Sequence, residues 1–225
     1  MRRAVHTAAM AAEVLPLPLL AERLPLPPPP GLDPLLDAAV ECLSRHGLSR
    51  TSLRDIAREM GVAPSTVSRK VGSVDQVAML VVAREAQRFL ERLPELVAGA
   101  SGPRVVTTVV VAAIERARAH PVVAKVVRDE DAWMGRVVTR RLDALLEQGV
   151  EIAVPLLVAA MDAGLVRRQD PALLAHWLLR AALAAVVAPP PGDLTEAVEA
   201  LLLPMLDPAG EPAPTGARRS RRPRR

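Results

Sequence analysis

The side chains whose types and spacing most clearly suggest a chemistry lie between two glycines, Gly61 and Gly72. Three hydroxyls and two cations occur there, and no acidic residue is present from Gly61 to Ser73. They belong to Ser65, Thr66, Ser68, Arg69 and Lys70. Arginine can bridge the O6 and N7 atoms of guanine, and hydroxyls can contact base edges or phosphate. The segment therefore predicts a surface that reads the major groove of DNA, with the solvated face of an ordinary helical hairpin as the alternative.

Apolar periodicity places these groups on the second of two short helices. The first helix is capped by Ser52, is ended by Gly61 and shows i, i+3, i+4, i+7 spacing at Leu53, Ile56, Ala57 and Met60. Pro64 suits the first turn of a second helix that runs to about Val71. These are the dimensions of a helix-turn-helix. The residues expected to face inward are Leu53, Ile56, Ala57, Val62, Val67 and Val71.

Helical periodicity continues on both sides of this hairpin, and no segment alternates as a strand does, so an all-α fold is predicted. Leu35, Ala39 and Leu43 repeat at i, i+4 and i+8 in a helix that ends at Gly47. Further helices are expected at 73–93 with a Ser73–Gln76 capping box, at 104–120, after Pro121, at 131–162 with a kink or break at Pro155, at 171–187 and at 193–206.

Both ends of the chain differ in composition from the part between them. Residues 1–31 end in a proline-rich run, which predicts an extended arm that is either a spacer or a ligand for an aromatic-lined groove. Residues 208–225 hold six arginines, which predicts a disordered tail that either binds DNA phosphates or only aids solubility. Without those six arginines, 23 of the 29 basic residues remain, against 25 acidic residues, so the rest of the chain is nearly neutral. The pI of about 10.4 therefore says little about function.

Few side chains are suited to enzyme chemistry. Cys42 is the single cysteine, which excludes an internal disulfide and favours a reducing cytoplasm. The three consecutive acids at 129–131 spread around a helix, so a solvated helix start is expected rather than a metal site. The four histidines are far apart in sequence, at His6, His46, His120 and His176.

We therefore expect no enzymatic activity, no cofactor and no metal. The first residues superficially suggest a signal peptide, but Glu13 and the prolines interrupt it. No apolar run reaches the roughly 18 to 20 residues that span a membrane. A cytoplasmic protein is expected, neither secreted nor membrane-bound.

The helix-turn-helix segment resembles the tetracycline-repressor (TetR) family over about residues 33–90, with matching spacing and no gap. The matching strings are Leu36-Asp37-Ala38-Ala39, His46-Gly47, Thr51-Ser52-Leu53-Arg54-Asp55-Ile56-Ala57, Gly61-Val62-Ala63, Ser65-Thr66-Val67 and Gly72-Ser73. The resemblance implies an all-helical homodimer whose first three helices bind a double-stranded operator. The remainder would bind a small-molecule inducer and the partner subunit.

The resemblance also implies roles for single residues. Ser52 would hold a phosphate, and Arg54 would reach a base or phosphate. The face that reads DNA would consist of Ser65, Thr66, Ser68, Arg69 and Lys70. Two departures from the family pattern stand out. The family usually has an aromatic pair in the stretch where this sequence has Ser68 to Val71. It also usually has lysine at the position of Val74. Fewer contacts to thymine methyl groups are then expected, and Arg69 and Lys70 would favour a G-rich operator.

Composition sets off an arm (1–31) and a tail (208–225), and the resemblance divides the part between them into a helix-turn-helix domain (32–73) and a ligand-binding and dimerisation domain (74–207). Apolar residues that either line a ligand cavity or form plain core are Phe89, Val109, Ile114, Trp133, Met134, Val137, Met161 and Trp177. Residues expected to pair two subunits as a four-helix bundle are Leu173, Leu174, Trp177, Leu178, Ala182, Ala185, Leu194, Val198, Leu201, Leu202 and Leu206.

The function this predicts is a sequence-specific transcriptional regulator, a repressor that a small apolar ligand releases from its operator. A helical protein–protein interaction module with a vestigial helix-turn-helix is the alternative. Retention on immobilised DNA separates the two.

Overall fold

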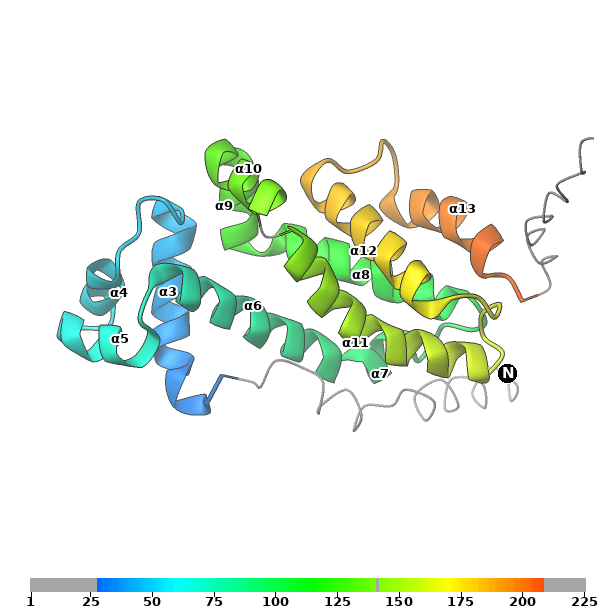
Figure 1. Cartoon of the computed structure of the whole chain (residues 1–225), viewed down its shortest axis with the longest axis horizontal. Coiled ribbons are helices and arrows are strands. Elements are labelled where there is room, and N and C mark those ends of the chain that lie inside the picture. The colour runs from blue at the N-terminus through cyan, green and yellow to red at the C-terminus, as the bar shows by residue number, and fades with distance from the viewer. Residues whose placement is uncertain (1–27, 141, 209–225) are drawn as a thin grey trace, which may run out of the picture.

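A computed structural model of the chain describes residues 28–140 and 142–208, which form helices joined by loops (Figure 1). No strand occurs among these residues, which confirms the predicted all-α class. The arginine tail and residues 1–27 of the proline-rich arm lie outside the described part. The last residues assigned to the arm begin a short 3-10 helix, η1 (Pro30–Leu32).

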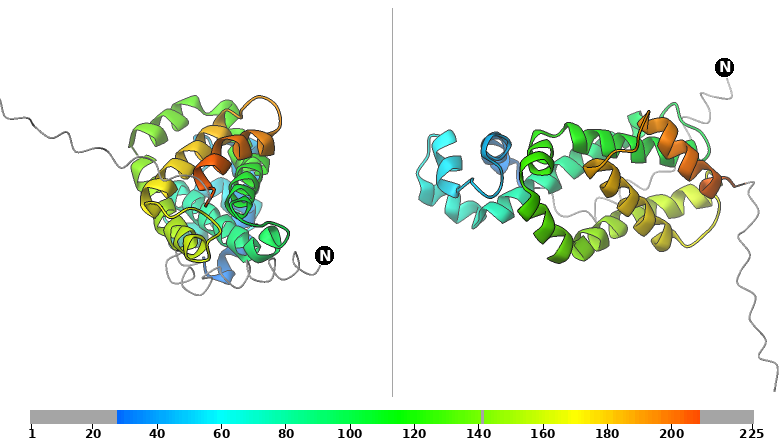
Figure 2. Two further views of the ribbon diagram at one scale, coloured as in Figure 1. Left: turned by 90° about the vertical axis from the view of Figure 1, so that its right-hand side faces the viewer. Right: turned by 90° about the horizontal axis from the view of Figure 1, so that it is seen from above.

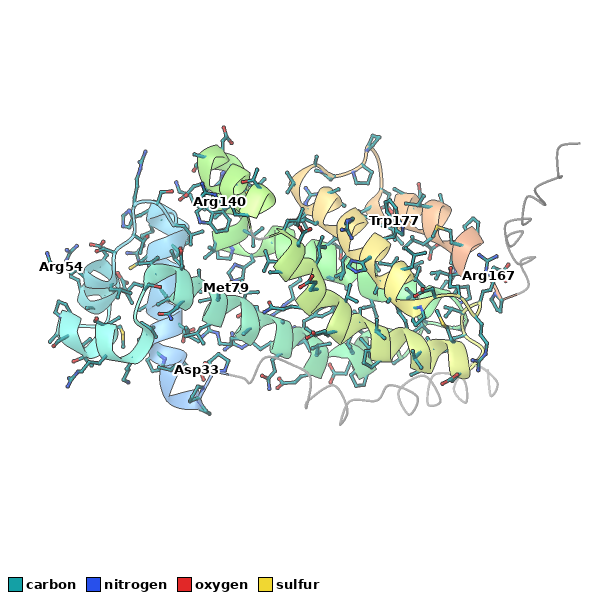
Figure 3. All side chains as sticks on the ribbon, in the orientation of Figure 1. Asp33, Arg54, Met79, Arg140, Arg167 and Trp177 are labelled. Atoms are coloured by element: carbon teal, nitrogen blue, oxygen red, sulfur yellow. The ribbon has the colours of Figure 1, made fainter. Side chains whose placement is uncertain are left out.

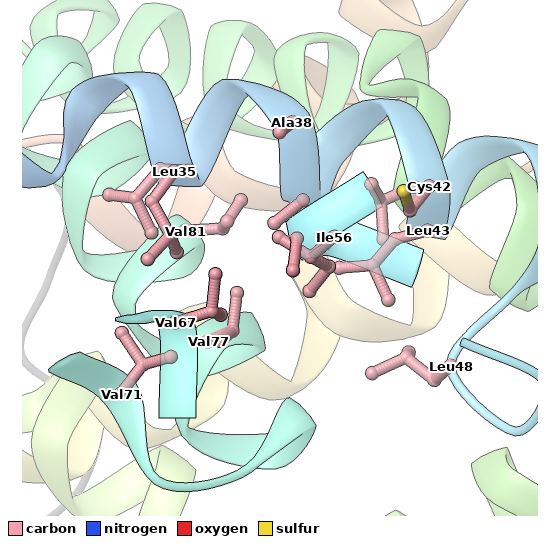
Figure 4. Close-up of a cluster of buried hydrophobic side chains, with 14 of the residues drawn as sticks. Leu35, Ala38, Cys42, Leu43, Leu48, Ile56, Val67, Val71, Val77 and Val81 are labelled. Atoms are coloured by element: carbon pink, nitrogen blue, oxygen red, sulfur yellow. The ribbon is translucent and has the colours of Figure 1, made fainter. Parts of the chain in front are cut away.

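Three short helices form one end of an elongated molecule: α3 (Asp33–His46), α4 (Leu53–Glu59) and α5 (Pro64–Val71) (Figure 1). We call these three helices and their loops the helix-turn-helix unit. Their apolar faces meet in one core, in which Leu43, Ile56 and Val67 are 0% exposed (Figure 4). Cys42 belongs to the same core, and burial raises the pKa of its thiol.

The core of the helix-turn-helix unit extends beyond Ser73, the predicted domain boundary. Val77 and Val81 belong to it and come from the long helix α6 (Val74–Glu91). Val122 and Val126 belong to it as well and come from α9 (Pro121–Asp129). The unit is therefore packed against two helices that continue into the rest of the molecule, and its orientation depends on both.

The predicted helix at 73–93 is α6 in the structure and ends two residues earlier than predicted, and a further short helix follows that was not predicted. Ser73 caps α6 by accepting a hydrogen bond from the backbone N of Gln76 at 3.2 Å, and α6 ends at Glu91. A separate short helix, α7 (Leu93–Val97), follows after Arg92. Pro94 explains the break, because it has no N–H to donate to the preceding turn and its ring crowds the carbonyl there.

The predicted helix at 131–162 is α10 (Asp131–Arg140) and α11 (Leu142–Asp162), with the undescribed residue 141 between them. Pro155 lies inside α11 and does not split it, contrary to one of the two outcomes predicted. An apolar face packed against a neighbouring helix outweighs the loss of one backbone hydrogen bond. The remaining helices match the prediction within a residue: α8 (Arg104–Ala119), α12 (Pro171–Val187) and α13 (Leu194–Leu206).

A second core joins α8, α11, α12 and α13 away from the helix-turn-helix unit (Figure 2). Leu157, Met161, Leu174 and Leu206 are buried in it. By length and composition α11 could cross a membrane, although no uninterrupted apolar run of that length was found in the sequence. A core helix of a helical protein passes the same test, and α11 packs against α12, so this property alone does not indicate membrane insertion.

Candidate nucleic-acid interface

The first helix of the helix-turn-helix, α4, begins with a complete capping box. The Ser52 hydroxyl accepts a hydrogen bond from the backbone N of Asp55 at 3.3 Å, and the Asp55 carboxylate accepts from the backbone N of Ser52 at 3.0 Å. The Ser52 hydroxyl also donates to that carboxylate at 2.6 Å. These bonds hold the pKa of Asp55 below its ordinary value. Ser52 caps α4 as predicted, but its hydroxyl proton is already donated within the chain.

The second helix, α5, separates an apolar face from a polar one. Val67 and Val71 are 0% and 5% exposed, and both lie in the core of the helix-turn-helix unit. Pro64 occupies the first turn, and Gly72 ends the helix with a φ of 66°. Because the buried valines fix the rotation of α5, its opposite face is held towards solvent.

The polar face of α5 carries all five residues predicted to read DNA. Ser65, Ser68, Arg69 and Lys70 are exposed, and Thr66 is half-buried. Arg69 Nε donates to the carbonyl oxygen of Ser65 at 3.2 Å, so the guanidinium lies along its own helix. That bond uses one of the five N–H donors of the guanidinium. Hydroxyls and cations therefore lie together on one face of α5, a helix that itself carries no acid.

Val62 does not face inward as predicted. It is 37% exposed, in the turn between α4 and α5. Its backbone N donates to the carbonyl of Ala57 at 3.0 Å, and the backbone N of Gly61 donates to Arg58 at 3.1 Å. These bonds close the C-terminus of α4 through the positive φ of Gly61, and this turn directs Val62 to solvent.

Arg54 completes the set of predicted DNA contacts. It is exposed on the first turn of α4 and lies at the outer end of the molecule, opposite Arg167 (Figure 3). Helices α4 and α5 pack against each other, so the structure brings all seven predicted residues to one end of the molecule. Contact of these residues with DNA stays a prediction.

The eight residues predicted to line a cavity or fill a core are not gathered around one space. Ile114 and Met161 are buried in the second core, whereas Trp133 and Met134 of α10 pack against the helix-turn-helix core. Phe89 is half-buried, Val109 packs against a small cluster around Val97, and Trp177 is 62% exposed. The side chain of Val137 lies outside the described part of the structure.

An apolar cavity of about 260 Å³ lies between α8, α12 and α13. Ile114 is the one predicted cavity residue that lines it. The other walls are short aliphatic side chains, among them Leu178, Ala185, Val198 and Leu202. The sequence did not point to this space because the alanines of α12 look like any other helix-forming residues.

Glu130 is a functional candidate that the sequence did not reveal. It follows α9 directly and is 8% exposed, so the predicted solvated run of acids is wrong at this position. Its carboxylate accepts hydrogen bonds from Ser49, in the loop between α3 and α4. Asp129 and Asp131 beside it are exposed, and the sequence offers no signal that distinguishes the middle acid.

The comparisons with known proteins agree with this geometry. A sequence model described as "Bacterial regulatory proteins, tetR family" matches residues 35–73. No curated protein sequence matches this chain.

Solved structures share the fold at low sequence identity. The fatty acid degradation regulator FadR from Bacillus halodurans superposes with a TM-score of 0.53 at 19% identity, covering 77% of this chain and 93% of its own. The SmeT–triclosan complex gives a TM-score of 0.51 at 22% identity, covering 75% and 89%. Residues 35–73, which hold both α4 and α5, therefore resemble the tetR family of bacterial regulatory proteins, and most of the chain shares the fold of these two solved structures.

Proposed function

We propose that this chain is a transcriptional regulator that binds its operator by placing α5 in the major groove, with Ser65, Thr66, Ser68, Arg69 and Lys70 towards the bases and phosphates. The observation that carries the proposal is the acid-free face of α5, held outward by the buried Val67 and Val71. A helix of this size fits the major groove, and short hydroxyls permit close approach to base edges. Arg69 and Lys70 then favour guanine-containing half-sites.

In the same pose α4 would cross the sugar–phosphate backbone. Its N-terminus presents backbone N–H groups that have no partner inside the helix, and such groups bind phosphate. Arg54 is exposed beside them and supplies a positive charge. Because the Ser52 hydroxyl is engaged by Asp55, its contribution to a phosphate contact requires that bond to open on binding.

Arg69→Ala is expected to weaken operator binding by about 1–3 kcal/mol and to relax base preference at one position of each half-site. The physical reason is the loss of a bidentate contact to guanine. Arg168→Ala is the matched control, since Arg168 is an exposed arginine paired with Asp162 at the end of α11, away from α5. Fluorescence anisotropy on duplexes selected by the wild type measures both, and equal affinities of the two variants across all base changes would exclude this orientation of α5.

We propose that the regulator acts as a homodimer through α12 and α13. Leu173 and Trp177 of α12 are 57% and 62% exposed, and Leu201 and Met205 of α13 are 60% and 37% exposed. Such apolar side chains on adjacent helices suit a two-fold bundle. Two reading helices then contact half-sites about 34–36 Å apart or a multiple of this. The molecule would work in the cytoplasm, where its operator lies.

We further propose that a small apolar ligand in the cavity between α8, α12 and α13 releases the regulator, which makes it a repressor. Apolar side chains of α8, α12 and α13, such as Ile114 and Ala185, line this space. One structure with the same fold was solved with triclosan. A ligand there contacts helices of the dimer surface, so it can change the spacing of the two reading helices.

Triclosan or decanoate in excess is expected to raise the melting temperature of the wild type, because a ligand at about 100 times its dissociation constant stabilises the folded state by about 2.7 kcal/mol. Ala185→Phe should abolish the shift by filling the cavity. Ala172→Phe is the matched control, on an exposed residue of α12 that does not line the cavity. A wild type that responds to neither compound, or an Ala185→Phe variant that responds fully, would contradict this ligand site.

A further inference from the structure

The loop between α3 and α4 is hydrogen-bonded to a residue that is distant in the sequence. Ser49 lies in this loop, and Glu130 lies 81 positions later, between α9 and α10. The two carboxylate oxygens of Glu130 each accept from the backbone N of Ser49 at 3.2 Å, and one also accepts from the Ser49 hydroxyl at 2.6 Å. We call this set the Glu130–Ser49 contact.

Within the described residues, the side chain of Glu130 has no other hydrogen-bond partner. Its neighbour Asp129 pairs with Lys125 at 2.7 Å on the outside of α9, whereas no lysine or arginine whose side chain the structure describes pairs with Glu130. A buried carboxylate is stable only when hydrogen bonds replace the water it has lost. Ser49 provides these bonds. The buried carboxylate between α9 and α10 therefore depends on one residue of the loop between α3 and α4 for its hydrogen bonds.

The position of this loop determines where α4 begins. The Thr51 hydroxyl donates to the carbonyl of Gly47 at 2.6 Å, which ties the loop across its own ends. Ser52 then caps α4, three residues after Ser49. A shift of Ser49 is therefore passed to the first turn of α4, and α4 packs directly on the reading helix α5.

The apolar contacts between α9 and the helix-turn-helix unit do not replace this contact. Val122 and Val126 enter the shared core and hold α9 beside α3. Packing of aliphatic side chains has little directional preference, whereas three hydrogen bonds to one residue define both a distance and an angle. The valines bring the two parts together, and Glu130 sets their register.

We propose that Glu130 is a positioning residue for operator binding, which holds the loop before α4, and with it α4 and α5, in the pose that fits DNA without touching DNA itself. This rests on the proposed DNA-binding function of α5. Glu130 follows α9, so the contact also couples the position of the later helices to the position of the reading helix.

Glu130→Gln tests the proposal, because glutamine keeps the shape and replaces one accepting oxygen by an amide group that only donates. Asp129→Asn is the matched control: the same chemical change, one residue away, on an exposed acid. We expect Glu130→Gln to weaken binding to duplexes selected by the wild type about 10-fold, as loss of a hydrogen bond to a carboxylate would. Asp129→Asn should bind within about twofold of the wild type.

Two further measurements separate positioning from a loss of folding. The slope of affinity against salt should stay at the wild-type value in Glu130→Gln, because no phosphate contact is removed, whereas removal of a phosphate-binding cation changes it by about one. Ser49→Ala removes only the hydroxyl bond of this contact and keeps the backbone N–H, so it should weaken binding less than Glu130→Gln, and the double variant should bind no worse than Glu130→Gln. Affinities are compared at a temperature where circular dichroism shows all variants folded.

The outcomes distinguish this inference from the proposed function. If the wild type enriches no duplex from a random pool, DNA binding by α5 and the role of Glu130 fail together. If it does, but Glu130→Gln binds as Asp129→Asn does, or the effects of Ser49→Ala and Glu130→Gln add, only the positioning role is overturned. Faster hydrogen exchange at the Ser49 amide in Glu130→Gln than in Asp129→Asn supports the contact without DNA, and equal exchange contradicts it.

Discussion

Gly47→Ala is expected to lower the free energy of unfolding by about 2–4 kcal/mol, because two penalties coincide at this residue. Gly47 ends α3 with φ 80° and ψ 172°, a conformation that residues with a Cβ rarely adopt. A Cβ there would also lie 2.9 Å from Glu130 Cδ and would collide with its carboxylate. The variant therefore strains the backbone and displaces Glu130 from Ser49. Urea unfolding followed by circular dichroism measures the loss.

Gly61→Ala is the matched control, because Gly61 also has a positive φ, 67°, but no atom lies within 4 Å of a Cβ placed there. It should show the strain alone, about 1–2 kcal/mol. In a Glu130→Ala background the cost of Gly47→Ala should fall to a similar value, since the colliding carboxylate is gone. Equal losses for the two glycine variants in the wild-type background would show that the contact with Glu130 has no energetic weight.

Trp177→Glu is expected to convert the proposed homodimer into monomers, the second large effect. Trp177 is 62% exposed in the isolated chain, next to the exposed Leu173, and large aromatic residues of this kind dominate interface energies. A carboxylate in its place would be buried without a partner. In a two-fold dimer the change occurs twice, so the dissociation constant should rise by more than about 100-fold. Sedimentation velocity at micromolar concentration reads out the change.

Val82→Glu is the control for this experiment, since Val82 is a 56% exposed apolar residue on α6, outside α12 and α13. It should leave the dimer intact. Operator affinity should fall with Trp177→Glu, because a monomer occupies one half-site only. Monomeric wild-type protein, or dimers of unchanged stability in Trp177→Glu, would reject α12 and α13 as the subunit interface.

Much of the helix-turn-helix unit follows from short-range rules. The caps at Ser52 and Ser73, the turn at Gly61 and the buried positions Ile56 and Val67 were all predicted, because each depends on residues three or four positions apart in one helix. The same rules identified the outward face of α5. Its sequence match to a family then added the expected partner, which local periodicity alone does not supply.

Local rules failed where a neighbour distant in sequence decides the outcome. A proline inside an apolar pattern predicts a kink or a break, yet α11 continues through Pro155 because it packs on α12. Pro94 does end a helix. Of the residues predicted either to line a cavity or to form plain core, Ile114 alone lines the space between α8, α12 and α13, because that space depends on how the three helices pack.

The acid-free face of α5 could thus be read from the sequence, because one helix turn places its members. The contacts that fix the orientation of α5 relative to the other helices could be found only in the tertiary structure. Glu130 is buried against Ser49, and Val122 and Val126 complete a core that otherwise belongs to the first helices. Such contacts depend on how all the helices pack at once, and a separation of 81 residues leaves no periodic trace in the chain.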